Sequence, residues 1–243
     1  MAASTFTRRS IAPMESVAHP LSIRVGDAHR VSALLQTPPN AQACCVLAHG
    51  AGAGMTHPFL EAVAHGLAER TIATLRYQFP FMERGSKRPD VPALTHATVR
   101  AAVAEALARV SHLPLFAGGK SFGGRMTSQA QAASPLAGVR GIIFLGFPLH
   151  PAGKPAQERA QHLFQVGCPM LFLQGTRDEL ADAQLVRSLH GQLGAKSTLV
   201  MIEDADHSFH VPARTGRKDA GVRDTLLDAI AGWIAEVIGR DSP

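Results

Sequence analysis

The stretch that decides the fold runs from Leu113 to Arg125 and reads LPLFAGGKSFGGR. Its first residues form a short apolar run typical of a buried strand, and the residues after Ser121 favour a helix. Between the two, Gly119, Ser121 and Gly123 give the pattern G-x-S-x-G. In this context the serine stands on a cramped strand-to-helix turn, because the flanking glycines let neighbouring backbone pass without Cβ clashes. The pattern predicts that Ser121 is a nucleophile.

Two other interpretations share these residues. Ser121 could serve only as the N-cap of the helix that follows it. The run 119–121 (GKS) also matches the end of a phosphate-binding P-loop, G-x-x-x-x-G-K-[ST]. The first glycine of such a loop would fall at Pro114, and Leu115 and Phe116 would have to wrap phosphates although they are typical of a strand. A P-loop is therefore not favoured.

Later strand ends supply a base and an acid for the serine, whose hydroxyl is a weak nucleophile until its proton is removed. Asp178 comes just beyond one predicted strand and His207 just beyond the next, which is the order that accompanies this strand–turn–helix motif. His207 would take the proton of Ser121, and Asp178 would fix its tautomer and stabilise the imidazolium. The alternatives are Glu179 and Asp206 for the acid and His210 for the base.

A tetrahedral intermediate also needs backbone N–H groups in place before its negative charge develops. One is expected from Phe122, directly after the nucleophile. The other is expected from the loop after the apolar strand 43–48, which reads HGAGAG over residues 49–54. Ala51 or Gly52 would donate it, and a glycine-rich turn without function is the alternative.

Strands and helices alternate along most of the chain. The patterns predict strands over 21–25, 31–35, 43–48, 72–77, 113–117, 139–147, 170–174 and 197–202, and helices over 58–68, 96–110, 121–133, 183–193 and 220–238. Such alternation predicts an α/β fold, with a mostly parallel sheet covered by helices on both faces and an antiparallel hairpin at its start. We expect a flexible leader over 1–18 and a single domain over 19–243. Trp233 lies beside an apolar stripe of the last helix and is expected in the core.

Composition excludes several classes of function. Hydrophobic residues make up 46% of the chain, yet no apolar run approaches the ~20 residues that span a bilayer. The net charge of +5 is scattered, and one Trp and one Tyr offer little for base stacking, so nucleic-acid binding is not favoured.

Cys44, Cys45 and Cys168 have neither disulfide nor metal-ligand spacing, which favours a reducing cytoplasm. No apolar stretch follows Arg8 and Arg9, so no secretory signal is expected. The oligomeric state, a homodimer included, is left open.

The sequence resembles the α/β-hydrolase superfamily, and more closely its dienelactone-hydrolase-like branch, in the group that also includes a scaffold subunit of a chromatin-modifying complex. Six phrases carry the resemblance: HGAGAG at 49–54, RYQFPFME at 76–83, GGKSFGGR at 118–125, GFPLHPAGK at 146–154, QGTRD at 174–178 and DADHSF at 204–209. The resemblance implies the triad Ser121, Asp178 and His207 and no metal or organic cofactor. Dienelactone hydrolases use a cysteine nucleophile, so a lactone substrate is not implied. A non-catalytic binding scaffold is the second hypothesis.

The expected reaction is cleavage of a small soluble ester or thioester through an acyl-enzyme. Lid domains of the superfamily usually follow the strand after the nucleophile helix, and here that interval, 147–167, is too short for one. An open cleft favours acyl groups of about two to six carbons. The loop 78–90 is expected to form one wall of the cleft with Phe79, Phe81 and Met82, although these residues fit a core equally well.

Most loops expected at the rim of the cleft carry a cation. Lys120 adjoins the nucleophile, Arg125 is four residues into the same helix, and Lys154 follows a neighbouring strand. The wall loop adds Arg84, Lys87 and Arg88. Each fits a solvated surface charge, and together they raise the hypothesis that the substrate carries a negative charge near its ester, with Lys120 and Lys154 among the binding residues.

Overall fold

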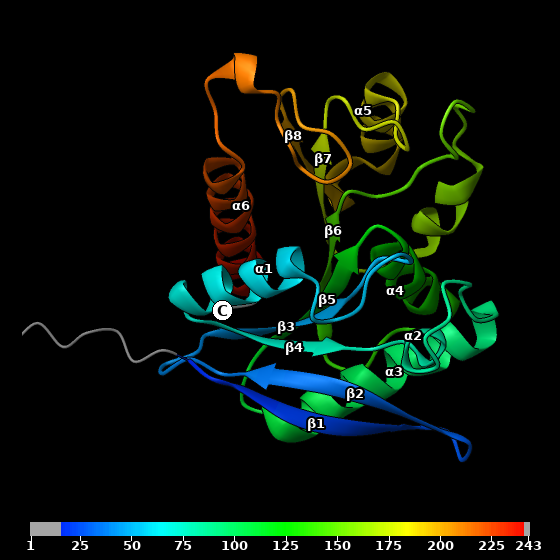
Figure 1. Cartoon of the computed structure of the whole chain (residues 1–243), viewed down its shortest axis with the longest axis vertical. Helices are drawn as coiled ribbons and strands as arrows, with labels where there is room; N and C mark the ends of the chain where they lie inside the picture. Colours follow the sequence, from blue (N-terminus) through cyan, green and yellow to red (C-terminus); the bar gives the residue numbers. More distant parts are fainter. Residues whose placement is uncertain (1–15, 241–243) are drawn as a thin grey trace, which may run out of the picture.

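The computed structural model describes residues 16–240, whose strands form one sheet in the order β1-β2-β4-β3-β5-β6-β7-β8 (Figure 1). The strands are β1 Ala18–Val25, β2 His29–Gln36, β3 Ala43–Ala48, β4 Ile72–Tyr77, β5 Leu115–Lys120, β6 Val139–Leu145, β7 Met170–Gly175 and β8 Ser197–Ile202. Residues 1–15 of the expected leader lie outside the described residues, and Ala18 already belongs to β1.

Six helices and three short 3₁₀ segments connect the strands. They are α1 Pro58–Glu69, α2 Pro80–Glu83, α3 Pro92–Arg109, α4 Phe122–Ala133, α5 Ala183–Leu193 and α6 Asp219–Arg240, with η1 Glu158–Gln165, η2 Gly194–Lys196 and η3 Ala213–Thr215. The strands β1 and β2 form an antiparallel hairpin, and β2 also pairs antiparallel with β4. The other pairs are parallel, so the expected fold class is confirmed.

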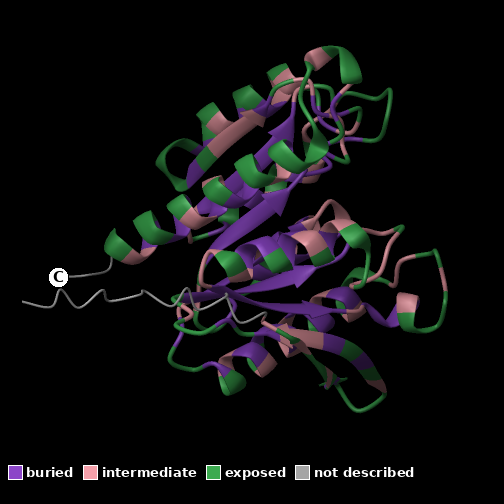
Figure 2. Ribbon diagram, turned by 60° about the vertical axis from the view of Figure 1, so that its left-hand side comes forward, coloured by how far each residue is buried: buried purple, intermediate pink, exposed green. Residues whose placement is uncertain are grey.

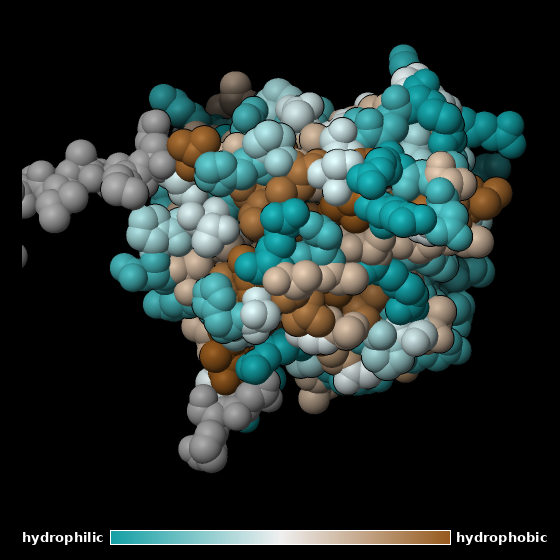
Figure 3. All heavy atoms as spheres, turned by 90° about the horizontal axis from the view of Figure 1, so that it is seen from below, coloured by the Kyte–Doolittle hydropathy of each residue, from teal (hydrophilic) through white to brown (hydrophobic). Residues whose placement is uncertain are grey.

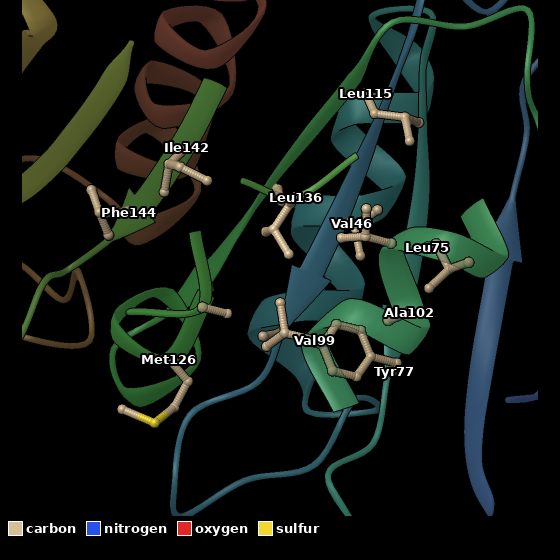
Figure 4. Packing of buried hydrophobic residues seen from close by; sticks show 14 of the residues in the cluster. Val46, Leu75, Tyr77, Val99, Ala102, Leu115, Met126, Leu136, Ile142 and Phe144 are labelled. Atoms are coloured by element: carbon tan, nitrogen blue, oxygen red, sulfur yellow. The ribbon is translucent and has the colours of Figure 1, made fainter. Parts of the chain in front are cut away.

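Helices cover both faces of the sheet because the parallel strands are apolar on both sides; every residue of β3, β4 and β7 is buried. On one face, α3, α4 and α5 pack over a core that includes Val46, Leu75 and Phe144 (Figure 4). On the other face, α1 and α6 pack over a second core. Trp233 is buried there against Phe116, with ring centroids 5.6 Å apart, as expected for a core residue. Figure 2 shows the buried strands between helices whose outer faces are exposed.

The main departure from the expected boundaries is the end of β5. The strand continues through Gly118 and Gly119 to Lys120, although glycine usually weakens a strand. A Cβ on Gly118 would lie 1.9 Å from the carbonyl oxygen of Ile143 on β6, so only glycine fits there. The parallel strands β3, β5 and β6 therefore end side by side next to Ser121.

The surface is mixed in character. Seen from below, hydrophobic residues are interspersed among hydrophilic ones (Figure 3). Among residues 16–240, no helix is both long and apolar enough to cross a bilayer.

Candidate active site

Ser121 lies on the sharp turn between β5 and α4. Its backbone has φ 50° and ψ −114°, a left-handed conformation that is strained for a serine. The turn packs against the end of β3, since a Cβ on Gly119 would lie 2.1 Å from the oxygen of Ala48 and one on Gly123 would lie 2.5 Å from the oxygen of His49. Both glycines of the motif are thus required by close backbone approach. Ser121 holds the N-cap position of α4, but its side chain makes no capping hydrogen bond.

His207 links the serine to a buried acid. Its Nε2 lies 2.9 Å from Oγ of Ser121, and its Nδ1 lies 2.7 Å from Oδ2 of Asp178. A carboxylate only accepts, so Nδ1–H donates to Asp178 and Nε2 is left to accept the hydroxyl proton of Ser121. The side chain of Asp178 is fully buried and that of His207 is 21% exposed. The structure thus brings together the three residues that the sequence singled out.

Two strand ends hold the acid in place. The amide Nε2 of Gln174, in β7, donates to Oδ2 of Asp178 at 2.5 Å, and the backbone N–H of Leu180 donates to Oδ1 at 2.8 Å. The other end of the same amide accepts the N–H of Phe147 at 2.9 Å, which ties the acid to the end of β6. Gln174 is fully buried and was missed as a site residue, although it begins the phrase that contains Asp178. The signal that could have revealed it is a polar residue at the end of an otherwise apolar strand.

Asp206, Glu179 and His210, the alternatives for the acid and the base, do not bond to Ser121 or to the imidazole of His207. Oδ1 of Asp206 accepts the backbone N–H groups of Ser208 and His210 and shapes the loop around His207. Glu179 is exposed. His210 pairs with Asp219 at 2.8 Å, and this pairing raises the pKa of the exposed imidazole.

Lys120 bonds the loop that carries His207, and only part of its side chain faces the cavity beside Ser121. Its Nζ donates to the backbone oxygen of His207 at 2.5 Å and lies 5.4 Å from the ring centroid of Phe209. Burial lowers the pKa of Lys120 to about 8, against the opposing effect of Asp178 and Asp206. The expectation that Lys120 binds substrate changes accordingly: its side chain lines the cleft, while its ammonium group holds the loop of His207.

The expected N–H donors lie around Ser121. Phe122 is the first residue of α4, so its N–H has no acceptor within the helix. Ala51 and Gly52 line a cavity that Ser121 also lines. Their loop is tied down by the buried His49, whose Nδ1 lies 2.7 Å from the oxygen of Gly50 and whose Nε2 accepts the N–H of Phe79 at 2.9 Å. Burial lowers the pKa of His49 to about 4, so this imidazole stays neutral and keeps both bonds.

Two cavities flank Ser121 and share only three lining residues, Ala51, Ser121 and Leu180. The histidine-side cavity, of about 410 Å³, also contains His207, Lys120, Phe59, Leu60, His57, Gly50, Gly52, Ala53 and Ser208. The helix-side cavity, of about 490 Å³, also contains Phe122, Arg125, Met126, Gln129, Pro89, Asp90, Pro92, Pro148 and Arg159. Ser121 is thus open to ligand on two sides.

The expected wall of phenylalanines is not formed. Phe79 and Phe81 are fully buried and line neither cavity, because α2 begins right after Phe79 and turns both rings into the core. Both rings pack edge-on against Phe122, at 5.5 and 6.0 Å between centroids. Met82 is partly buried against the same core. Phe79 and Phe81 thus pack beneath the turn that carries Ser121, and all three residues belong to the core instead of a pocket wall.

The surface cations are also placed differently from the expectation. Lys154 is exposed and lines neither cavity, since it lies on a turn between β6 and η1. Arg84, Lys87 and Arg88 are exposed, and Arg84 pairs with Asp90. Arg159, in η1, lines the helix-side cavity and was missed, because no sequence pattern marked its segment. Among residues 16–240, no group of three or more His, Cys, Asp or Glu side chains is arranged to hold a metal ion.

Comparisons with known proteins agree with the fold. A sequence model of the family described as "Alpha/beta hydrolase domain" matches residues 41–235. Among solved structures, a dienelactone hydrolase from Anabaena variabilis is 19% identical, with a TM-score of 0.72 over 92% of this chain and 99% of that one. A Xanthomonas campestris protein described as an α/β serine hydrolase without a lid is 23% identical, with a TM-score of 0.68 over 93% and 98%. A cold-adapted esterase from an Arctic intertidal metagenomic library is 24% identical, with a TM-score of 0.61 over 93% and 99%. At these identities the likeness concerns the fold.

Proposed function

The chain belongs to the α/β hydrolase family, and from that premise we propose that it is a serine hydrolase that cleaves small esters or thioesters. The observation that carries the proposal is the unbroken chain of hydrogen bonds from Ser121 through His207 to the buried Asp178. Activation of a serine needs a base within hydrogen-bond reach and a third group that orients the base. The three side chains come from three different strand ends, so a purely structural role does not account for their meeting at a cavity.

The first half of the reaction forms an acyl-enzyme. Oγ of Ser121 attacks the ester carbonyl carbon while Nε2 of His207 takes the hydroxyl proton, and Asp178 stabilises the imidazolium. The carbonyl oxygen becomes an oxyanion, which accepts from the N–H group of Phe122 and from that of Ala51 or Gly52. When the intermediate collapses, the bond to the leaving oxygen or sulfur breaks and His207 returns its proton to that atom.

The second half repeats these steps with water. His207 takes a proton from a water molecule, and the hydroxyl attacks the acyl carbon on Ser121. Collapse of the second intermediate releases a carboxylic acid and returns the proton to Oγ of Ser121. Besides substrate and water, these steps use only side chains and backbone N–H groups of this chain.

The cavities support a preference for small acyl groups. Each holds about 410 to 490 Å³, which is at the small end of ligand pockets. The interval between β6 and β7 contains only the 3₁₀ segment η1 as regular structure, so this part of the chain supplies no helical lid. We expect acyl groups of about two to six carbons and no activation at lipid interfaces.

The test is labelling and turnover of the intact chain. A fluorophosphonate should label Ser121 covalently, and 4-nitrophenyl acetate and butyrate should be hydrolysed. Ser121→Ala should abolish the label and lower kcat/KM by about three or more powers of ten with unchanged thermal unfolding. Ser188→Ala, at an exposed serine of α5, is the matched control and should change neither readout. A chain that is neither labelled nor active would instead support the non-catalytic scaffold.

A further inference from the structure

The helix-side cavity contains two arginines with no counter-ion. We propose that Arg125 and Arg159 bind a carboxylate on the acyl part of the substrate, so that the preferred substrates are half-esters or half-thioesters of dicarboxylic acids. This inference rests on the proposed hydrolase function and adds the class of acyl group. Of these two cations, the sequence brought forward Arg125 but not Arg159.

The two guanidinium groups lack partners of their own. Within residues 16–240, neither Arg125 nor Arg159 makes an ion pair or a side-chain hydrogen bond. Nε of Arg125 is buried with no acceptor. Burial, and then the charge of Arg159, lower the pKa of Arg125, so the two cations lie close enough to repel each other. An unpartnered buried donor beside a like charge is unfavourable, and an anion in the cavity would offset both effects.

The other titratable groups near Arg125 and Arg159 do not cancel their two charges. Asp90 lines the cavity; its Oδ1 pairs with Arg84, which lies outside the lining, at 2.5 Å, and its Oδ2 is buried with no hydrogen-bond partner among the described residues. His162 contacts Oγ of Ser128 at 2.8 Å, and burial and the charge of Arg125 lower its pKa to about 4, so it is neutral. The lining therefore carries two guanidinium charges and one carboxylate, and that carboxylate already has a counter-ion in Arg84.

The position of His207 decides which part of the substrate enters which cavity. The leaving atom must receive its proton from Nε2 of His207, so the leaving group lies on the side of that histidine. His207 lines the histidine-side cavity and not the helix-side cavity. The acyl chain consequently extends past Phe122 toward Arg125.

The reach of the arginines fits a short diacid. The N–H of Arg125 donates to the oxygen of Ser121 at 3.1 Å, which places the two residues one helical turn apart. Side chains one turn apart start about 5–6 Å from each other. A carboxylate separated from the reacting carbonyl by about two to four methylenes would fit between them. The planar fork of a guanidinium binds a carboxylate through two parallel hydrogen bonds.

The test compares two esters that differ in one charge. We use 4-nitrophenyl hydrogen adipate and its neutral counterpart, methyl 4-nitrophenyl adipate, with the uncatalysed rate of each subtracted. At low ionic strength, kcat/KM of the wild type should be about tenfold or more higher for the anionic ester, and added salt should reduce the ratio. Arg159→Gln and Arg125→Gln should each lower the ratio several-fold, because the anionic ester loses more kcat/KM than the neutral ester does. Arg187→Gln, at an exposed arginine of α5, makes the same change in net charge and should leave the ratio unchanged.

A second readout does not depend on turnover. Free adipate should slow the labelling of Ser121 by an uncharged fluorophosphonate, and Arg159→Gln should abolish this protection. Equal kcat/KM for the two esters, or a ratio that survives both arginine substitutions, would overturn the inference while leaving the hydrolase function intact. Absence of both turnover and labelling would instead count against the hydrolase function itself.

Discussion

The two sides of Ser121 differ in whether their polar side chains already have hydrogen-bond partners within the chain. On the side of β7 and β8, Asp178 receives hydrogen bonds from Gln174, Leu180 and His207, and Lys120 is bonded as well. On the side of η1, the guanidinium groups of two arginines have no bonded partner among the described residues. Groups fixed before substrate arrives are suited to stabilising a transition state, because no reorganisation is needed during the reaction. Groups left unbonded are suited to a ligand that supplies their partners.

The largest expected effect lies on the fully bonded side. Asp178→Asn keeps the shape but lets the amide donate toward Nδ1, which favours the wrong tautomer of His207. We expect kcat for 4-nitrophenyl butyrate to fall by about 10³ to 10⁴ with little change in KM. Asp206→Asn is the matched control, because the side chain of Asp206 accepts from Ser208 and His210 and not from the imidazole of His207, and its effect should be far smaller. Similar losses in both variants would mean that the acid has been misassigned.

Strong local patterns made much of this bonded side predictable. The bounds of β3, α5 and β8 follow from apolar periodicity alone. The turn at Ser121 follows from the two glycines of the G-x-S-x-G pattern between a predicted strand and a predicted helix, and Asp178 and His207 follow from their places after successive strands. Each of these features depends on residues close together in the sequence or on the order of elements.

Other residues around Ser121 were harder to predict because their roles depend on the direction of single side chains. An apolar residue in a loop fits a pocket wall and a core equally well, and only the four-residue helix α2 decides that Phe79 and Phe81 point inward. Lys120 ends a strand that was expected to stop earlier, which turns its ammonium group toward His207. Arg159 enters the cavity from a 3₁₀ segment whose sequence has no regular period. Tertiary packing sets all three directions.

A second prediction concerns the pH dependence of the bonded side. The pKa of Lys120 is lowered from 10.5 to about 8 in the folded chain, so between these values the unfolded chain binds a proton that the folded chain lacks. The contribution of Lys120 to stability therefore rises with pH across this window and is least favourable below about pH 8. In urea unfolding from pH 7 to 10.5, the free energy of unfolding of the wild type should gain about 2–4 kcal/mol relative to Lys120→Met.

The control for this measurement is Lys218→Met, at an exposed lysine. The difference between the wild type and that variant should stay nearly constant over the same pH range. A constant difference for Lys120→Met as well would show that the ammonium group is not buried against the loop of His207.

The smallest expected effect separates a built anion site from general positive charge. Lys154 and Arg88 are exposed and line neither cavity, whereas Arg159 lines the helix-side cavity. Because solvent and salt screen exposed charges strongly, Lys154→Gln and Arg88→Gln should change the preference for the anionic adipate ester by less than about twofold at 0.15 M salt. Arg159→Gln removes the same single charge and should lower that preference several-fold under the same conditions. If all three substitutions lowered the preference equally, the net charge of +5 would account for it, and the two sides of Ser121 would not differ in ligand binding.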